Sequence, residues 1–142
     1  MKKIHYILGI MIVILLMSFA WWIHRSSVDE GERLATDHCG SCHDLSAKKK
    51  NKRGPYLWGI VNRRAGIVDG FEYSEAFRQF ADSKSFVWSE INLDMLITDP
   101  DLLIPGTRMA ERESDSKHAK AFKNMQNLDN RKELIAFLKT LN

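Results

Sequence analysis

The sequence predicts an all-α domain with long loops, preceded by an N-terminal membrane segment. An uncharged apolar stretch opens the chain, and several later segments carry apolar residues at helical spacing. No stretch convincingly alternates apolar and polar residues as a half-buried strand would. A chain of 142 residues accommodates one domain and a short extension. We divide it into a membrane segment at 1–25, a short linker at 26–29 and a domain at 30–142.

The N-terminal segment has the length and the flanks of a membrane helix. Residues 6–23 carry no formal charge, and two lysines precede them. A membrane-spanning helix needs roughly 17–25 apolar residues, and Trp21 and Trp22 are of the type found at the membrane–water interface. We therefore expect a retained anchor. Two lysines before it, against Arg25 after it, favour an N-terminus on the inner side.

A cleaved signal peptide is the alternative for the same segment. Ser18-Phe19-Ala20 resembles the small-residue cleavage site that follows the apolar core of such peptides. Both alternatives export the domain. The first leaves it tethered to the outer face of the membrane by a single anchor, and the second gives a soluble exported protein.

The charge distribution argues against one class of partner. The chain has 21 Lys and Arg against 18 Asp and Glu, a net charge of +3. Lys2, Lys3 and Arg25 account for this excess, since residues 1–25 contain no acidic side chain. The rest of the chain is neutral overall, which argues against nucleic-acid binding through bulk phosphate attraction.

Capping residues and apolar spacing place the helices of the domain. We expect short helices at 30–38 and 74–81. Ser89 is expected to cap a third helix, which ends at the residue before Pro100.

Two further helices are expected near the C-terminus. Ser116 is predicted to cap an added helix that extends to about Leu128. Asn130, with Glu133 three residues later, resembles a capping box for the closing helix. After it, one apolar stripe at helical spacing consists of Leu134, Phe137, Leu138 and Leu141.

One motif carries the chemistry. Both cysteines lie in Cys39-Gly40-Ser41-Cys42-His43, and Cys-x-x-Cys-His is the signature of c-type haem attachment. The spacing lets two thiols add across the two vinyl groups of haem and places the imidazole beneath the iron. The alternatives are a thioredoxin-like pair, a zinc site and a local disulfide. The first normally lies in a βαβ unit, the second needs four ligands, and the third gives His43 no role.

The second axial ligand decides what a haem does, and a Met/His pair is the electron-transfer choice. Three of the six methionines lie in the N-terminal segment. Met95 and Met125 lie in helical patterns and are expected to pack in the core. Met109 follows residues 104–108, where Pro and Gly disfavour regular structure. From the residues alone, Met109 is the favoured candidate of the three.

The chain resembles the class I cytochromes c, of the mitochondrial and bacterial periplasmic type, over most of residues 30–142. Besides Cys-x-x-Cys-His, further family motifs occur in the family's order. They are Gly-Pro-x-Leu-x-Gly at Gly54, Pro55, Leu57 and Gly59; Arg-x-Ala-Gly at Arg63, Ala65 and Gly66; Gly-Phe-x-Tyr-Ser at Gly70, Phe71, Tyr73 and Ser74; the family tryptophan at Trp88; Pro-Gly-Thr-x-Met at Pro105, Gly106, Thr107 and Met109; and the closing-helix pattern at Arg131, Leu134, Ile135, Ala136, Phe137, Leu138 and Lys139.

The resemblance implies a class I cytochrome c fold around one haem c, attached covalently through Cys39 and Cys42. It implies that His43 and Met109 are the axial ligands. It also implies that the Pro55 carbonyl accepts a hydrogen bond from His43, which fixes the tautomer. The implied residues that hydrogen-bond or screen the haem propionates are Arg63, Tyr73, Trp88 and Thr107.

Three positions depart from the family pattern. Leu96 stands where the family has a tyrosine bonded to the methionine sulfur, and Glu111 stands where an aromatic residue shields the haem edge. Ala35 replaces an aromatic residue that packs on the closing helix, and Leu34 is expected to compensate. These changes concern the protection of the methionine ligand. They leave the two thiols and His43 untouched.

The function implied by the resemblance is that of a one-electron carrier in a respiratory-type chain, not an enzyme. The implied partners are redox proteins such as a quinol-oxidising complex or a terminal oxidase, with no nucleic acid and a monomeric chain. The basic run 48–53 is either a solvated loop or a docking patch for an acidic partner. The alternative function is a haem-based sensor or peroxidase-like protein in which Met109 is labile.

Overall fold

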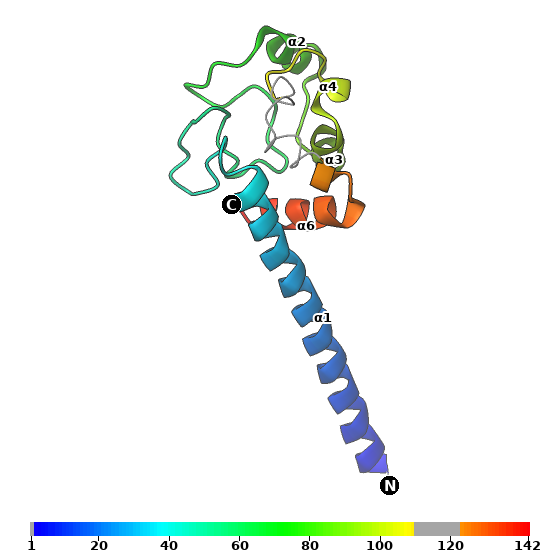
Figure 1. The fold of residues 1–142 in the computed structure, drawn as a ribbon. Helices are drawn as coiled ribbons and strands as arrows, with labels where there is room; N and C mark the ends of the chain where they lie inside the picture. Colours follow the sequence, from blue (N-terminus) through cyan, green and yellow to red (C-terminus); the bar gives the residue numbers. More distant parts are fainter. Residues whose placement is uncertain (1, 110–122) are drawn as a thin grey trace.

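The computed structural model describes residues 2–109 and 123–142, and helices joined by long loops make up this part of the chain (Figure 1). The only β pairing among these residues is an isolated antiparallel bridge between Arg64 and Val87. The all-α class is therefore confirmed. The helices are α1 (Lys2–His38), α2 (Glu75–Lys84), α3 (Glu90–Thr98), α4 (Pro100–Leu103) and α6 (Leu128–Leu138).

Helix α1 is much longer than the expected helix at 30–38. Residues 26–29, expected as a linker, lie inside it. Residues 10–30 contain neither Gly nor Pro, so nothing in the sequence breaks the helix there. The Ser26 hydroxyl donates to the Ile23 carbonyl at 2.8 Å, which satisfies a polar group without interrupting the helix.

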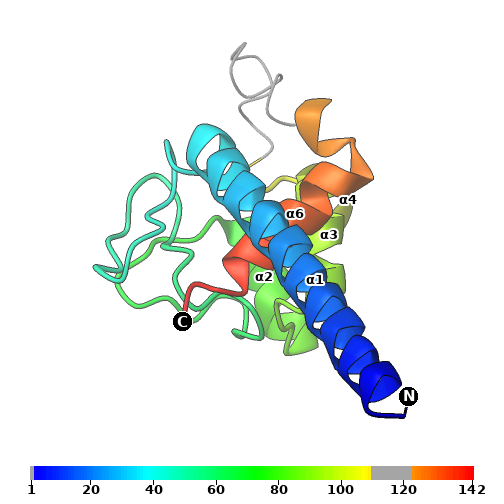
Figure 2. The same cartoon turned by 90° about the horizontal axis from the view of Figure 1, so that it is seen from below.

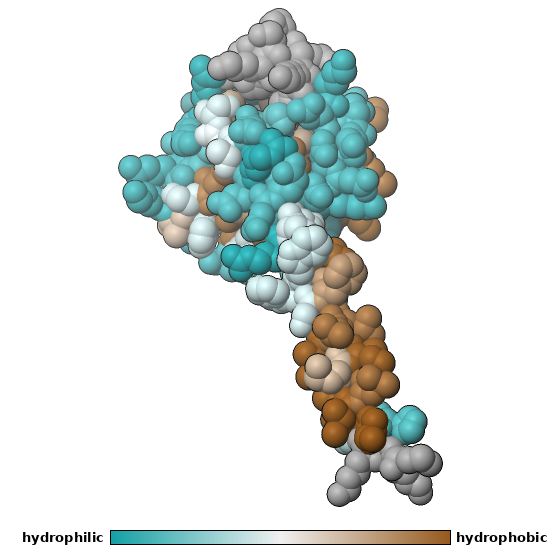
Figure 3. Space-filling view, turned by 60° about the horizontal axis from the view of Figure 1, so that its bottom comes forward, coloured by the Kyte–Doolittle hydropathy of each residue, from teal (hydrophilic) through white to brown (hydrophobic). Residues whose placement is uncertain are grey.

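The apolar half of α1 projects from the domain as an exposed rod, seen in brown in Figure 3. By length and composition, the stretch Ile4–His38 can cross a membrane. Its most apolar window has a mean hydropathy of 2.3, and none of that window is buried.

The other end of α1 crosses α6 at close range (Figure 2). The contact requires Gly31, because a Cβ there would lie 2.0 Å from the Glu133 carbonyl oxygen. One turn later Leu34 and Ala35 are 1% and 0% exposed. The small Ala35 is thus part of the core, and Leu34 fills space there as expected.

Helix α6 presents three members of the predicted apolar stripe, Leu134, Phe137 and Leu138, to this core. The fourth, Leu141, follows the end of the helix and is also buried. The predicted capping box at Asn130 is wrong, because Asn130 lies within the helix and Asn127 is the N-cap, accepting from the N–H groups of Asp129 and Asn130. The Asn130 amide instead donates to the Asn124 carbonyl at 3.0 Å. The helix therefore begins three residues earlier than expected.

Helices α2 and α3 begin where the sequence predicts. Ser74 caps α2 by accepting from the Phe77 N–H, and Ser89 caps α3 by accepting from the Asn92 N–H. Helix α4 was not expected. Asp99 accepts two N–H groups at its start, and Pro100 sits in its first turn, where a missing N–H breaks no helical hydrogen bond.

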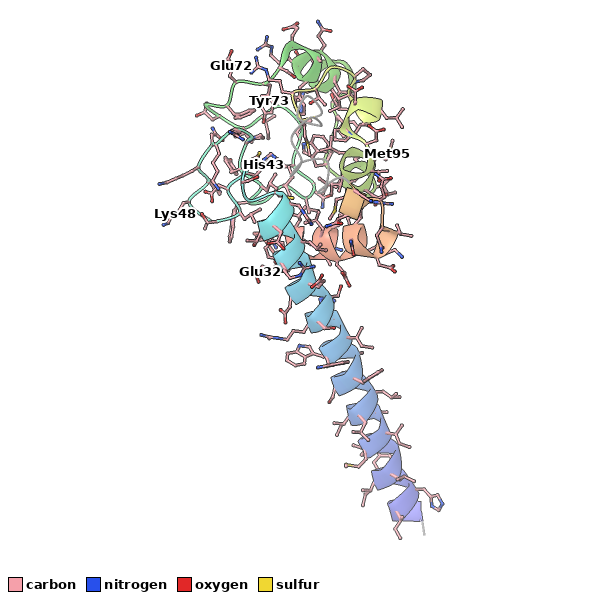
Figure 4. All side chains as sticks on the ribbon, in the orientation of Figure 1. Glu32, His43, Lys48, Glu72, Tyr73 and Met95 are labelled. Atoms are coloured by element: carbon pink, nitrogen blue, oxygen red, sulfur yellow. The ribbon has the colours of Figure 1, made fainter. Side chains whose placement is uncertain are left out.

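Two methionine expectations have opposite outcomes. Met125 is buried in the core, as expected for a packing residue. Met95 is not, since 49% of it is exposed on α3, and in Figure 4 it lies on the outer side of that helix. The expected helix from Ser116 and the departure at Glu111 fall outside the described residues.

Candidate functional site

The motif Cys-x-x-Cys-His forms a tight turn at the end of α1. The N–H groups of Cys39 and Gly40 both donate to the Ala35 carbonyl, at 2.8 and 2.9 Å. The N–H groups of Cys42 and His43 then both donate to the Cys39 carbonyl, at 3.0 and 2.9 Å. The backbone alone thus brings two thiols and one imidazole into a single turn.

Neither thiol is in a disulfide. Burial raises the pKa of Cys39 to about 12, and the proximity of Cys42 adds to this effect. A thiol with a raised pKa is protonated at neutral pH, so Cys39 is a poor nucleophile for thiol–disulfide exchange. Both sulfur atoms are therefore available for covalent bonds to a ligand.

The imidazole of His43 is fixed from one side. Its Nδ1 lies 2.6 Å from the Pro55 carbonyl oxygen. A carbonyl only accepts, so Nδ1 carries the proton and Nε2 carries the lone pair that can bind a metal. Gly54 lies against the same ring, because a Cβ there would be 2.2 Å from His43 Cε1. Burial lowers the pKa of His43, which keeps the imidazole neutral and able to coordinate.

The loop after the turn is organised by Asp44, a residue that the sequence reasoning missed. One carboxylate oxygen accepts from the N–H and hydroxyl of Ser46, and the other accepts from the Lys50 N–H at 2.8 Å. These bonds lower the pKa of Asp44. The spacing Asp-x-Ser is a local signal for such a turn.

Lys52 was expected to be part of a solvated or docking run, but its ammonium is turned toward the protein. It donates to the carbonyls of Gly40 and His43, at 2.8 and 3.1 Å. These carbonyls belong to the turn that holds the cysteines. Lys48, by contrast, lies at the outer edge of the loop (Figure 4). The basic run therefore contains at least one lysine with a structural contact.

Arg63 is a half-buried cation held by backbone carbonyls. Its guanidinium donates to Tyr56 at 2.8 Å and to Trp58 at 3.0 Å, and it lies 4.9 Å from the centre of the Tyr56 ring. Burial lowers the pKa of Arg63. In the part of the chain that the structure describes, no carboxylate forms an ion pair with it. Such a cation suits an anionic group supplied by a ligand.

Tyr73 and Trp88 are joined through an aromatic cluster. The rings of Tyr73 and Phe77 stack with centroids 4.7 Å apart, and Phe77 lies 6.2 Å from Trp88. The backbone N–H of Trp88 donates to the backbone carbonyl of Arg63 at 2.9 Å. This bond connects the aromatic cluster to the segment that carries the Arg63 guanidinium. Tyr73 accepts from the Val68 N–H, and burial raises the pKa of Tyr73. Three of the four residues expected near the propionates, Arg63, Tyr73 and Trp88, are thus connected through the Arg63–Trp88 backbone hydrogen bond and the Phe77 ring.

Met109 lies in a separate turn, after α4. Thr107 is buried, its N–H donates to the Ile104 carbonyl at 3.0 Å, and its hydroxyl accepts from the Met109 N–H at 3.5 Å. Met109 itself is 37% exposed. The segment before Met109 is thus an irregular turn, as its Pro and Gly predict, and the Thr107 hydroxyl holds the backbone of Met109.

These groups together fit one kind of ligand. Two reduced cysteines accept two covalent bonds, a neutral imidazole offers a lone pair to a metal, and a half-buried arginine is available to an acidic substituent. Haem has all three features: two vinyl groups, an iron and two propionates. An all-α domain with this set of groups defines the class of c-type haem proteins.

Comparison with known proteins points to the same class. The chain is 32% identical to cytochrome c of Euglena viridis over 113 residues, which cover 80% of this chain and 95% of that protein. It is 35% identical to cytochrome c-550 of Novispirillum itersonii over 106 residues, covering 72% and 88%. The solved structure of cytochrome cH from Methylobacterium extorquens matches with a TM-score of 0.62 at 28% identity, covering 80% of this chain and 97% of that one. No protein-family model matches the chain.

The chain belongs to the cytochrome c family. Its fold is that of a class I cytochrome c. It carries covalently bound haem c and functions in electron transfer, together with redox partners. The relatives are electron carriers rather than enzymes.

Proposed function

We propose that this chain is a membrane-anchored one-electron carrier, not an enzyme, in which Cys39 and Cys42 hold the haem and His43 and Met109 are its axial ligands. The single observation that best supports this is the 2.6 Å contact between His43 Nδ1 and the Pro55 carbonyl. When bound, the haem supplies an iron that alternates between Fe(II) and Fe(III). With His43 and Met109 both bound to it, that iron would have no open position for a substrate.

The residues around the haem are proposed to orient His43 and to bind the propionates. Pro55 and Gly54 hold the imidazole in one tautomer and one orientation, so it would be held ready to bind the iron in either oxidation state. Arg63, Tyr73, Trp88 and Thr107 are proposed to bind or screen the propionates, whose negative charge would otherwise be buried without a partner. A site that is already arranged needs little reorganisation when an electron is gained or lost.

We propose that the apolar half of α1 is retained as the anchor, with the domain on the periplasmic side of a bacterial inner membrane. Cleavage, which gives a soluble periplasmic form, is the alternative outcome. The exposed apolar surface of α1 supports the anchor. The proposed partners are a quinol-oxidising complex and a terminal oxidase, and the proposed state is monomeric. An anchor raises the local concentration of carrier near such complexes.

The axial ligand is tested with two methionine variants of the holoprotein, Met109→Leu and Met95→Leu. The first is expected to abolish the weak far-red absorption band that sulfur coordination gives to ferric haem, and to lower the reduction potential. The second removes an exposed methionine and is expected to change neither. If Met109→Leu leaves the spectrum and potential of the wild type intact, sulfur ligation by Met109 is wrong.

The sequence favours a second candidate function, a sensor or peroxidase-like protein with a labile distal ligand, because Leu96 stands where the family has a tyrosine bonded to the methionine sulfur. Carbon monoxide distinguishes the two. The carrier is expected to resist binding when reduced, whereas rapid binding at stoichiometric gas would favour the sensor.

A further inference from the structure

The membrane segment and the haem domain share one helix, with no flexible linker between them. Val28 already packs against the core of the domain. Ile23 is the last residue of the apolar stretch, so only residues 24–27 separate the two regions. All four are helical. Tethered domains usually carry a longer Gly-, Ser- or Pro-rich segment at this place.

Local contacts stabilise the helix on both sides of this junction. The Ser26 hydroxyl bonds to Ile23 before it, and Arg33 forms ion pairs with Glu30 and Asp37 after it. The Gly31 contact with α6 then fixes the helix to the domain. A bend between the membrane and the domain would require breaking backbone hydrogen bonds in a segment that has neither Gly nor Pro.

The membrane end of the helix also has orienting groups. Trp21 and Trp22 are exposed near the end of the apolar stretch, and the Arg25 guanidinium lies 5.7 Å from the centre of the Trp21 ring. Indole and guanidinium groups prefer the membrane–water interface, so they resist sliding of the helix along the membrane normal. The height of the domain above the membrane is therefore fixed by contacts at both ends of this helical segment, at the membrane interface and at α6.

We propose that α1 acts as a rigid spacer, here called the mast, in which residues 23–38 fix the height and orientation of the haem domain above the membrane. An α-helix rises about 1.5 Å per residue, which places Cys39 ~24 Å along the helix axis from Ile23. The proposal rests on the retained anchor of the proposed function. It specifies the partner as a redox protein embedded in the same membrane, with its docking surface at that height. A partner that diffuses freely in solution has no need of a fixed height.

The test is linear dichroism of the haem absorption bands in oriented bilayers, with the full-length holoprotein. A fixed domain holds the haem plane at one angle to the membrane normal, so the bands are expected to be dichroic. Seven residues, Gly-Ser-Gly-Gly-Ser-Gly-Gly, are inserted after Arg25 in one variant. This insertion is expected to lower the dichroism several-fold, because the domain can then tumble.

A helical insertion of the same length is the matched control. Ala-Glu-Ala-Ala-Ala-Lys-Ala at the same place lifts the domain by ~10 Å but turns it by only about 20°. It is expected to retain the dichroism of the wild type. The proposal of a rigid α1 is contradicted if the glycine variant and the wild type show equal dichroism, or if the haem absorption of the wild type shows no dichroism.

Intact mass and haem staining of the same samples separate this result from a failure of the proposed function. A sample without covalent haem contradicts the carrier itself. A native-host membrane sample without residues 1–25 contradicts the anchor, and the mast with it. If haem and anchor are both present and the absorption is isotropic, only the mast is wrong.

Discussion

The domain has two sides that are held together by different forces. On one side α1 and α6 pack through apolar side chains, including Leu34, Ala35 and Leu134, all of which are buried. On the other side the loop 39–59 is held by hydrogen bonds, such as those from the Gly54 N–H to the Cys42 carbonyl and from the Leu57 N–H to the Asp44 carbonyl. The helical side contains its own core, whereas the loop side carries Cys39, Cys42 and His43, the residues proposed to attach the haem and bind its iron.

This difference predicts which side depends on the haem. Apolar burial contributes roughly 25 cal/mol per Å², and the loop side buries few complete apolar side chains of its own. Backbone ordering costs about 1–2 kcal/mol per residue. Long loops with little burial therefore need the cofactor to offset that cost, as in other small domains completed by a bound group.

The largest expected effect is that of removing the cofactor. In the Cys39→Ala/Cys42→Ala chain without haem, we expect the domain to be largely unfolded. Backbone amide hydrogen exchange measures this residue by residue, and the amides of Gly59, Ala65 and Trp88 are expected to lose protection. An apoprotein that keeps native helicity and protection in residues 30–142 would contradict the role given to the haem.

The next largest effect is expected at Gly54, on the loop side. A methyl group there would lie 2.2 Å from the His43 ring, so Gly54→Ala must displace the imidazole or the backbone that binds it. We expect a several-fold lower yield of haem-loaded protein and weaker axial ligation, measured by absorbance per chain. Gly9→Ala is the control, since a Cβ at Gly9 meets no atom within 4 Å. Normal loading of the Gly54 variant would show that this contact does not position His43.

On the helical side, Gly31 gives the corresponding test. Gly31→Ala places a methyl group 2.0 Å from the Glu133 carbonyl oxygen, so α1 and α6 must move apart. Overpacking of this kind costs about 1–3 kcal/mol. We expect this loss in the free energy of unfolding of the holoprotein, measured by denaturant titration, with an unchanged visible spectrum. A change in the spectrum with no loss of stability would contradict the division into two sides.

The smallest effect is expected at Lys52. Replacing it by Gln removes an ammonium that donates to the carbonyls of Gly40 and His43. A net hydrogen bond contributes about 0.5–1.5 kcal/mol, and exposure places this one at the low end. We expect a slight loss of stability for Lys52→Gln and none for Lys48→Gln. Equal stabilities for the two variants would show that the Lys52 hydrogen bonds do not stabilise the fold.

The two sides also differ in how far sequence reasoning reached. Helix starts at Ser74 and Ser89 and the stripe on α6 were predicted correctly, because capping and periodicity are local. The continuity of α1 was not predicted, because adjacent serines are typical of linkers, whereas a serine hydroxyl can also bond to the preceding turn of a helix, as that of Ser26 does. The start of α6 was misplaced because Asn127 and Asn130 are both suitable caps, and only the packed structure distinguishes them.

Sequence motifs predict site residues where those residues lie close together in the sequence. Cys39, Cys42 and His43 lie in one turn, so a short local motif is enough to propose them together. The contacts of Lys52 and Tyr56 depend on how the loop folds back, which no local pattern encodes. The exposure of Met95 was also missed, because helical spacing alone does not say which face of a short helix is covered.

The most direct measurement of the central claim is the intact mass of the purified full-length protein, taken with its visible spectrum in both oxidation states. The account predicts the mass of the polypeptide plus one haem, stable to denaturation, and low-spin spectra for both states. A colourless product with the mass of the bare chain, made in a host able to mature c-type cytochromes, would contradict it.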